Sequence, residues 1–590
     1  MSAFLGTVNP GFVLVVIGLI GLVVPVQRVR QGLMIIAPLI GMFMLANAQQ
    51  DTNLMTAQAL GIDLILYRVD NLNFIFGLAF LIAALLNAIY AMHTDDRLQD
   101  GMAMAYAGAA VAAAFAGDLM TLFVFWELTA VSSVFLILRA GTRAAYFASM
   151  RYLAIQILSG VLLLDGIAYV YKSTNSLTIE AFTSLNEPGA MFIFLAVGIK
   201  AAFPFLHNWL QDSYPKATVV GAVVLSAFTT KLAVLTCARL FPGFEILIWI
   251  GAVMTIFPVF FAVIENDLRK VLAYSLNNQV GFMICAIGVA DLTTEYGRLA
   301  MNGAAAHAFA HIIYKALLFM SMGAVLYRTG TAKANELGGL YKSMPFTTVF
   351  CLIGAASISA FPLFSGFVAK SLTMSAVAHE GYIIAWLMLL FASAGVLEHS
   401  GIKIPYFAFF GHDSGKRVQE APFNMLLAMG IAAAICILVG LPTFMGLGYG
   451  WLYNLLPYPT EANGYQPFTA EHILTQMQLL MLAILAFILL KRFGLYPPEK
   501  PGTILDTDWT YRKLGFGFAT WASTVWAKAG PAMSRVSATV AGRAFDRIEE
   551  AFSPRGQLSR GPLSGGMAIW TAALLGMAML LSFITVGAAR

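Results

Sequence analysis

The sequence has very little charge for its length. Asp, Glu, Lys and Arg together make up only 11% of its 590 residues, whereas 59% are hydrophobic; ordinary soluble domains have about 25% charged residues. A soluble protein of this size could not remove so much apolar surface from water, so soluble globular, disordered and fibrous classes are excluded. The composition indicates a protein that crosses a membrane many times, because one span takes about 20 apolar residues.

Cysteine is also scarce, and motifs for cofactors are missing. The four cysteines, at positions 237, 285, 351 and 436, each stand alone in an apolar run, without CxxC or Cys/His spacing. A disulfide framework, a zinc site and an iron–sulfur cluster are therefore not expected, and we predict no cofactor. The sequence has no Gly-rich phosphate loop and no nucleophile motif, which argues against a stand-alone enzyme. The net charge of +5 is scattered, so nucleic-acid binding is not predicted.

Apolar runs separated by short polar loops predict about sixteen membrane spans. Lipid cannot satisfy backbone polar groups, and runs of this length exclude the alternating pattern of a barrel, so the spans are expected to be helices. Loops after odd-numbered spans, through the thirteenth, carry fourteen Lys and Arg, whereas loops after even-numbered spans carry four. This bias predicts cytoplasmic odd loops and an outside N-terminus. The first apolar run lacks a basic leader and a cleavage site, so we expect a retained first span.

Titratable side chains inside the apolar runs are the most informative residues. Burying one such group costs a few kcal/mol, which makes each a functional candidate. One lysine alone could be structural or could extend toward the membrane surface, but one glutamate cannot neutralise five lysines. A buried lysine that releases its proton can carry protons, so the set predicts a proton relay. The residues are Glu127, Lys200, Lys231, Lys315, Lys370 and Lys403, with Glu398 and His399 just before the last.

His307, His311 and Lys315 recur every four residues in the run AAAHAFAHIIYKALLFM. This spacing predicts that the three share one helical face. A lone histidine in a helix is usually an ordinary core residue, but three titratable groups on one face favour a relay. A zinc site is a weaker interpretation, because the glutamate of an HExxH motif is absent.

Two of the lysines lie near helix breakers. Lys200 precedes Ala-Phe-Pro at 202–204, and Lys370 follows Ala-Phe-Pro at 360–362. Interrupted helices in corresponding places of two halves are typical of inverted-repeat transporters with a site near the membrane midplane. The alternative is a pair of ordinary proline kinks.

Six segments, in order, resemble a known family over about residues 70–410: FVFWELTAVSS, GIKAAFPFLHNWLQDSYPKAT, SAFTTKLAVLTCARLFPG, NDLRKVLAYSLNNQVGF, HAFAHIIYKALLF and FPLFSGFVAKS. They resemble the antiporter-like proton-channel proteins of respiratory complex I (its L, M and N subunits) and of Mrp-type cation/proton antiporters (their A and D subunits), and look closest to the Mrp D type. The resemblance implies an all-α polytopic fold with fourteen core helices and two inverted five-helix repeats. Helices 7 and 12 would be broken, and about two spans would follow the core.

The resemblance also implies roles for the buried residues. In the family's order, the span-5 glutamate, the lysines of spans 7 and 8, the His-His-Lys series of span 11 and the lysine of span 12 correspond to Glu127, Lys200, Lys231, His307, His311, Lys315 and Lys370. Gln279 stands where some relatives carry histidine, so the link between the halves is expected to use water there. Gln279, Glu398, His399 and Lys403 are possible additional members, although Lys403 matches no family position.

The expected organisation combines the spans with the resemblance. The segments are helices 1–3 (1–100), a first repeat of helices 4–8 (101–240), a second repeat of helices 9–13 (241–411), helices 14–15 (412–490), a polar segment (491–566) and a last span (567–590). The polar segment holds Trp509, Trp521 and Trp526. We expect it to be cytoplasmic, with helices on the membrane surface; a partly ordered linker is the alternative.

The expected function is that of a proton-translocating subunit of a multisubunit Mrp-type Na⁺/H⁺ antiporter. Its expected partners are other membrane subunits of the same complex, H⁺, Na⁺ and the lipid bilayer, in the inner or plasma membrane of the cell. One alternative is the proton-pumping subunit of a complex I-like quinone oxidoreductase or membrane hydrogenase. Another is a proton-driven module of an inorganic-carbon uptake complex.

Overall fold

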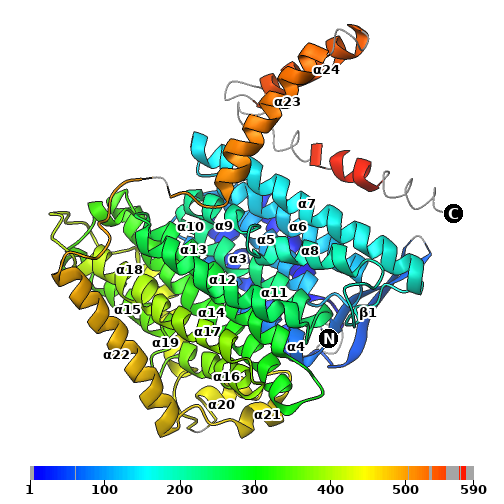
Figure 1. Ribbon diagram of the computed structural model, residues 1–590. Coiled ribbons are helices and arrows are strands. Elements are labelled where there is room, and N and C mark those ends of the chain that lie inside the picture. Colours follow the sequence, from blue (N-terminus) through cyan, green and yellow to red (C-terminus); the bar gives the residue numbers. More distant parts are fainter. Residues whose placement is uncertain are drawn as a thin grey trace. The chain divides into compact units, whose positions relative to one another are not determined.

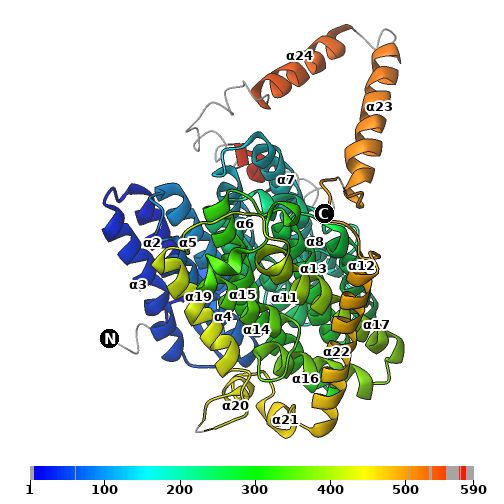
Figure 2. The same cartoon turned by 90° about the vertical axis from the view of Figure 1, so that its left-hand side faces the viewer.

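The computed structural model describes residues 6–59, 61–444, 446–502, 504–529, 535–552, 570–571 and 573–579, and the structural statements below concern these residues. The chain divides into two compact units, Met1–Ile504 and Leu505–Arg590. In the first unit, long helices pack side by side, with α22 along one flank of the bundle (Figures 1 and 2).

The first unit begins with a helical pair, a hairpin and a third long helix. Their bounds are α2 (Pro10–Val23), α3 (Gln27–Ala46), β1 (Thr52–Ala59), β2 (Ile62–Val69) and α4 (Asn71–Ala91). The first predicted repeat contains α5 (Arg97–Ala114), α6 (Leu119–Leu138), α7 (Arg143–Thr174), α8 (Ala190–Ala201), α9 (Asn208–Ser213), η1 (Tyr214–Lys216), α10 (Val219–Ala227) and α11 (Thr229–Leu240).

The second predicted repeat has a similar series of long and interrupted helices. It contains α12 (Glu245–Ile264), α13 (Leu268–Val289), α14 (Glu295–Thr329), η2 (Ala334–Glu336), η3 (Leu340–Lys342), α15 (Pro345–Ile358), α16 (Ser365–His379), α17 (Ile383–Val396), η4 (Leu397–Ile402), α18 (Lys403–Pro405) and η5 (Tyr406–Phe410). The unit ends with α19 (Phe423–Leu438), α20 (Tyr449–Tyr453), α21 (Pro459–Gly464) and α22 (Ala470–Arg492).

Within the described residues, ten helical runs are long and apolar enough to cross a membrane, and four shorter apolar helices accompany them. The predicted class, a multi-pass helical membrane protein, is thereby confirmed. The number of fourteen core helices and the boundaries of the predicted segments stay predictions.

Several of the sparse acidic residues begin helices. Asp70, Asp96, Asp118 and Asp267 each accept hydrogen bonds from backbone N–H groups in the first turn of α4, α5, α6 and α13. These N–H groups have no partner within the helix, so a capping carboxylate satisfies them. Part of the charge at the ends of the spans therefore serves helix termini.

The two predicted breaks are present and have matching backbone geometry. Ala202 and Phe205, between α8 and α9, have φ values of 64° and 67°; Ala360 and Leu363, between α15 and α16, have 57° and 74°. In each pair the first residue is the alanine of Ala-Phe-Pro and the second directly follows the proline. L-residues in this left-handed region interrupt a helix, so helices 7 and 12 are broken as expected.

A third break was not predicted. The eighth span is divided between α10 and α11, at Phe228. The hydroxyl of Tyr106 in α5 lies 2.5 Å from Thr229 Oγ1 and accepts a hydrogen bond from Thr229 N at 3.0 Å. The break has neither proline nor glycine, and its partner is far away in sequence, so no local pattern indicates it.

The hairpin of β1 and β2 is a second feature that the sequence analysis did not include. Its strands pair in antiparallel register from Thr52↔Val69 to Ala59↔Ile62, with irregular register near Met55. Asp118, which caps α6, also accepts a hydrogen bond from Ile65 N at 2.7 Å. The hairpin is thus tied to the start of the helix that carries Glu127.

The second unit contains η6 (Thr510–Gly515), α23 (Phe516–Ala529) and α24 (Arg535–Phe552). The predicted cytoplasmic or interfacial location of 491–566 stays a prediction. Of the predicted last span, 567–590, only residues 570–571 and 573–579 are described, and the rest lies outside the described residues.

Candidate proton-relay site

Glu127 and Lys200 face each other from α6 and α8 without forming a contact ion pair. The Lys200 ammonium donates to Trp126 O at 2.7 Å and to Thr129 Oγ1 at 2.9 Å, and lies 4.1 Å from the centroid of the Trp126 ring. The two charges still act on each other electrostatically. Lys200 is therefore held by the neighbours of Glu127 on α6.

The Glu127 carboxylate is buried, and neither oxygen has a hydrogen-bond partner among the described residues. It lies against Gly160 of α7, where any Cβ atom would overlap the carboxylate. Glycine is thus the residue that leaves room for the acid. A buried carboxylate without bonds is poorly stabilised as an anion, which suits a group that takes up a proton.

Lys231 is fully buried next to the unpredicted break in the eighth span. Its ammonium donates to Ser226 O at 2.7 Å. This carbonyl belongs to the last turn of α10, where carbonyl groups lack partners within the helix and the helix dipole is negative. The break therefore supplies a carbonyl acceptor for the buried side chain of Lys231.

Lys370 has the same arrangement in the second half. Its ammonium donates to Ile358 O, the last carbonyl of α15, at 2.8 Å. It also lies 5.0 Å from the centroid of the Phe282 ring, which is 5.7 Å from the ring of His307. Lys370 is thus bonded to the broken helix and is separated from His307 of α14 by the Phe282 ring.

His307, His311 and Lys315 lie on α14, as predicted, and all three are fully buried. His307 Nε2 lies 3.1 Å from Gln279 Oε1 and 3.0 Å from the Tyr314 hydroxyl, which donates to the same Gln279 oxygen. Gln279 therefore contacts the series directly rather than only through water. Its position fits the predicted additional member.

Both ring nitrogens of His311 and the ammonium of Lys315 have no hydrogen-bond partner within the described part of the chain. Buried polar groups are usually bonded, so the protons and lone pairs of these groups are not committed to protein atoms. Lys231, Lys315 and Lys370 all act electrostatically on His311. The series on α14 therefore lies within the electrostatic reach of lysines from both halves.

Lys403 has a different environment from the other lysines. Its ammonium donates to three carbonyls near the end of α12, those of Ala262, Val263 and Glu265, at 3.2, 2.6 and 2.6 Å. It also forms an ion pair with Glu499 at 3.0 Å. All its protons are committed, so the geometry favours a structural cation at a helix terminus over a relay member.

Glu398 and His399 precede Lys403 and lie on η4, and their surroundings differ from each other. Glu398 accepts a hydrogen bond from the Tyr496 hydroxyl at 2.6 Å. His399 is fully buried, lies within hydrogen-bonding reach of the Gly395 backbone, and is acted on electrostatically by Lys315 and Lys403. Tyr496 and Glu499, from the segment after α22, were missed by the sequence analysis because nothing local links them to η4.

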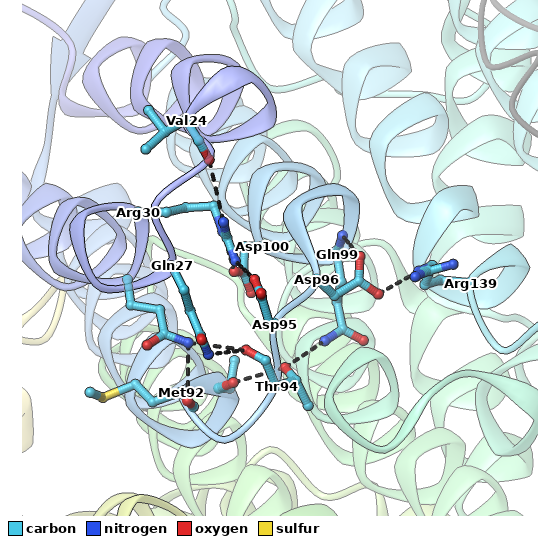
Figure 3. A network of polar contacts seen from close by, with 12 residues as sticks. Val24, Gln27, Arg30, Met92, Thr94, Asp95, Asp96, Gln99, Asp100 and Arg139 are labelled. Atoms are coloured by element: carbon cyan, nitrogen blue, oxygen red, sulfur yellow. Dashed lines mark hydrogen bonds and ion pairs between the residues drawn. The ribbon is translucent and has the colours of Figure 1, made fainter.

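An ion network, partly buried, lies at the starts of α3 and α5 (Figure 3). Arg30 is fully buried and pairs with Asp100 at 2.8 Å and with Asp95 at 2.5 Å, while Asp96 pairs with Arg139. Arg30 is one of the fourteen Lys and Arg counted above in the loops after odd-numbered spans. The acidic cluster at 95–100, following an apolar run, was the available signal for its partners.

The row of relay candidates is not a continuous chain of direct contacts. Among the described residues, no hydrogen bond or ion pair joins Lys200 to Lys231, so a proton passing between them needs water or a side-chain movement. Nor do any three His, Cys, Asp or Glu side chains in the described residues group as metal ligands would.

Two halves that each carry a broken helix and a buried lysine, joined by a titratable helix face, define an antiporter-like membrane protein. Residues 116–398 match the family model described as NADH:quinone oxidoreductase/Mrp antiporter, TM. The chain is 33% identical over 348 residues to the D subunit of the Na(+)/H(+) antiporter of Alkalihalophilus pseudofirmus, covering 55% of this chain and 68% of that protein. The chain therefore belongs to the NADH:quinone oxidoreductase/Mrp antiporter membrane-subunit family.

Other comparisons agree on the fold but differ in the kind of complex. Hydrogenase-4 component B of Escherichia coli is 28% identical over 417 residues, covering 63% of this chain and 61% of that protein. The matched region is thus less than two thirds of that relative. A chain in the structure of the Mrp complex from Dietzia sp. DQ12-45-1b matches with a TM-score of 0.66 and 21% identity, over 81% of this chain and 99% of that chain. At this identity, the structural match supports the fold alone.

Proposed function

We propose that the chain is the proton-translocating membrane subunit of a multisubunit Mrp-type Na⁺/H⁺ antiporter. The observation that carries the proposal is the row of buried titratable groups that passes through both broken-helix halves. Its members are Glu127, Lys200, Lys231, His307, His311, Lys315 and Lys370, with Gln279 bonded to the row. The similarity to the D subunit of an Na(+)/H(+) antiporter supports Na⁺ as the exchanged cation.

The geometry suggests how a proton would move. Lys231 and Lys370 each donate to a carbonyl at a helix end, whereas the ring nitrogens of His311 are uncommitted within the described residues. A proton on either lysine disfavours a proton on His311, because like charges repel strongly in a medium of low polarity. Protonation of either lysine therefore favours loss of a proton from His311.

The proposed setting follows from the same features. The chain would assemble with other membrane subunits in the plasma or inner membrane of a cell, with its positively charged loops in the cytoplasm. Glu398 and His399 would extend the row toward η4, whereas Lys403 would hold the structure there.

A second candidate is a proton-pumping subunit of a redox-driven membrane complex, favoured by the similarity to hydrogenase-4 component B. The two candidates differ in their partners. Purification of the native complex in mild detergent with iron–sulfur and flavin subunits would favour the redox complex. Purification with small hydrophobic subunits alone would favour the antiporter.

Transport in everted vesicles that contain the whole complex tests the proposal. Replacing Lys231 with Ala should abolish Na⁺-dependent proton movement while the complex still assembles. The matched control is Lys333→Ala, because Lys333 is an exposed lysine paired with Glu336. Undiminished exchange in the Lys231 variant would defeat the proposal.

A further inference from the structure

A cavity of about 250 Å³ lies between α16, α17 and α22. Lys370 is one of its lining residues, so the cavity reaches a member of the buried row. The helix α22 lies beyond residues 116–398, the part that matches the family model. The cavity is many times larger than the space that one water molecule needs.

The lining combines apolar side chains with several ionisable and hydroxyl groups. It includes Lys370, Ser371, Ser375, His379, Glu471 and His472. Inside a membrane, ionisable side chains face protein or water-filled space. Farther along α22 the surface is apolar, with Met481 and Leu482 54% and 65% exposed. The helix therefore has a polar part at the cavity and an apolar part that suits lipid.

The cavity runs along α16, from the C-terminal end of this helix to Lys370. His379 ends α16, and Glu471 lies in the first turn of α22; both line the same cavity. Lys370 lies nine residues before His379 on α16, which places it about 14 Å deeper at 1.5 Å per residue. This is about half of a hydrocarbon core roughly 30 Å thick.

His379 and Glu471 mark the end of the cavity that the loop charges predict to be outside the cell. The loop after α16 follows an even-numbered span, whereas Lys416 and Arg417 belong to the positively charged loops of the opposite side. The cavity therefore connects Lys370 with the side away from the predicted cytoplasm.

The helix α22 is also bonded to the broken helix. The amide of Gln476 donates to Ser359 O at 3.2 Å, one residue before the left-handed Ala360. At the start of α22, His472 Nδ1 lies 3.4 Å from the Tyr465 hydroxyl and 3.3 Å from Gln466 O. These contacts hold α22 as the outer wall of the cavity.

We propose that α22 completes an aqueous vestibule through which protons pass between Lys370 and the outer surface, with Glu471 and His472 as the last protein groups on the way. The proposal rests on the proposed proton transport. It adds a helix and two residues that the row of buried groups does not contain.

Thiol labelling tests the vestibule without depending on transport. Ser375→Cys is placed in the complete complex, and a charged, membrane-impermeant thiol reagent is applied to right-side-out or everted vesicles. The four native cysteines are all buried. We expect labelling of the new cysteine from the outer face only, and no labelling of the control Leu482→Cys on the lipid side of α22. Absence of labelling, or labelling only from the cytoplasmic face, overturns the proposal.

Transport measurements test the two residues. Combining Glu471→Gln with His472→Ala should slow proton transport about tenfold, equivalent to about 1.4 kcal/mol in the barrier, while Ser375→Cys remains accessible in that background. The control His412→Ala, at an exposed loop position, should leave the rate unchanged. Full activity of the double variant, beside an inactive Lys231→Ala, overturns the role of these two residues and leaves the proposed function standing. Labelling without any effect of Lys231→Ala overturns the proposed function instead.

Discussion

Lys403 is predicted to stabilise the fold rather than carry protons. Replacing it with Met keeps most of the length of the side chain but removes the cation that three carbonyls near the end of α12 and the carboxylate of Glu499 share. The exposed fraction of the Glu499 side chain is only 6%. Removing one partner of a buried ion pair costs about 3–5 kcal/mol, because the other charge stays buried without compensation.

A double variant separates the cost of the unpaired Glu499 carboxylate from the cost of lost packing. Adding Glu499→Leu to Lys403→Met removes the uncompensated carboxylate, and replacing both partners of a buried pair by apolar residues is often neutral or stabilising by about 1–4 kcal/mol. The double variant should therefore be more stable than Lys403→Met alone, although three carbonyls still lack their donor.

The assay is thermal unfolding of the purified complex in mild detergent, together with proton transport at a temperature below all transitions. We expect the unfolding midpoint to fall in Lys403→Met and to recover partly in the double variant, with transport retained in both. Lys333→Met should change the midpoint little, because exposed pairs contribute about 0–1 kcal/mol. An unchanged midpoint with lost transport would refute the structural role and return Lys403 to the relay.

Three other contacts lead to predictions of their own. Gly160→Ala should lower transport at least as strongly as it lowers stability, because its methyl group displaces the carboxylate of Glu127; overpacking of this kind costs about 1–3 kcal/mol. The control is Gly32→Ala, since a Cβ atom at Gly32 of α3 meets open space, and normal transport in the Gly160 variant would show that the carboxylate can move without loss of function. Gln279→Leu should slow proton transport and leave assembly intact, since it removes the acceptor bonded to His307; unchanged rates across pH would remove Gln279 from the site. Arg30→Met should destabilise the complex by about 3–5 kcal/mol, because it leaves the buried Asp100 unpaired, and an unchanged unfolding midpoint would show that the network in Figure 3 contributes little.

The sequence predicts the features that arise from local composition. Long apolar runs indicate the spans, and Ala-Phe-Pro marks both breaks, at Ala202 and Ala360, because proline cannot continue a helix in the ordinary way. The buried lysines are visible in the same way, since a charge within an apolar run is conspicuous. The structure places these residues in the interior, while their transport roles stay predictions.

The features that the sequence does not reveal depend on partners far along the chain. The break at Phe228 is bonded to Tyr106, and Lys403 pairs with Glu499. A single sequence carries no signal for such pairs, because each member looks ordinary within its own segment. The cavity beside α22 belongs to the same class, as its walls come from separate helices.

The most direct test of a continuous proton route is Lys370→Met in everted vesicles containing the complete complex. If one route crosses both halves, this change should abolish Na⁺-dependent proton movement as completely as Glu127→Gln, although the two residues lie in different halves. Assembly of the complex is checked by purification in mild detergent. Retention of transport in the Lys370 variant, with Glu127→Gln inactive, would contradict a single route by showing that the first half works alone.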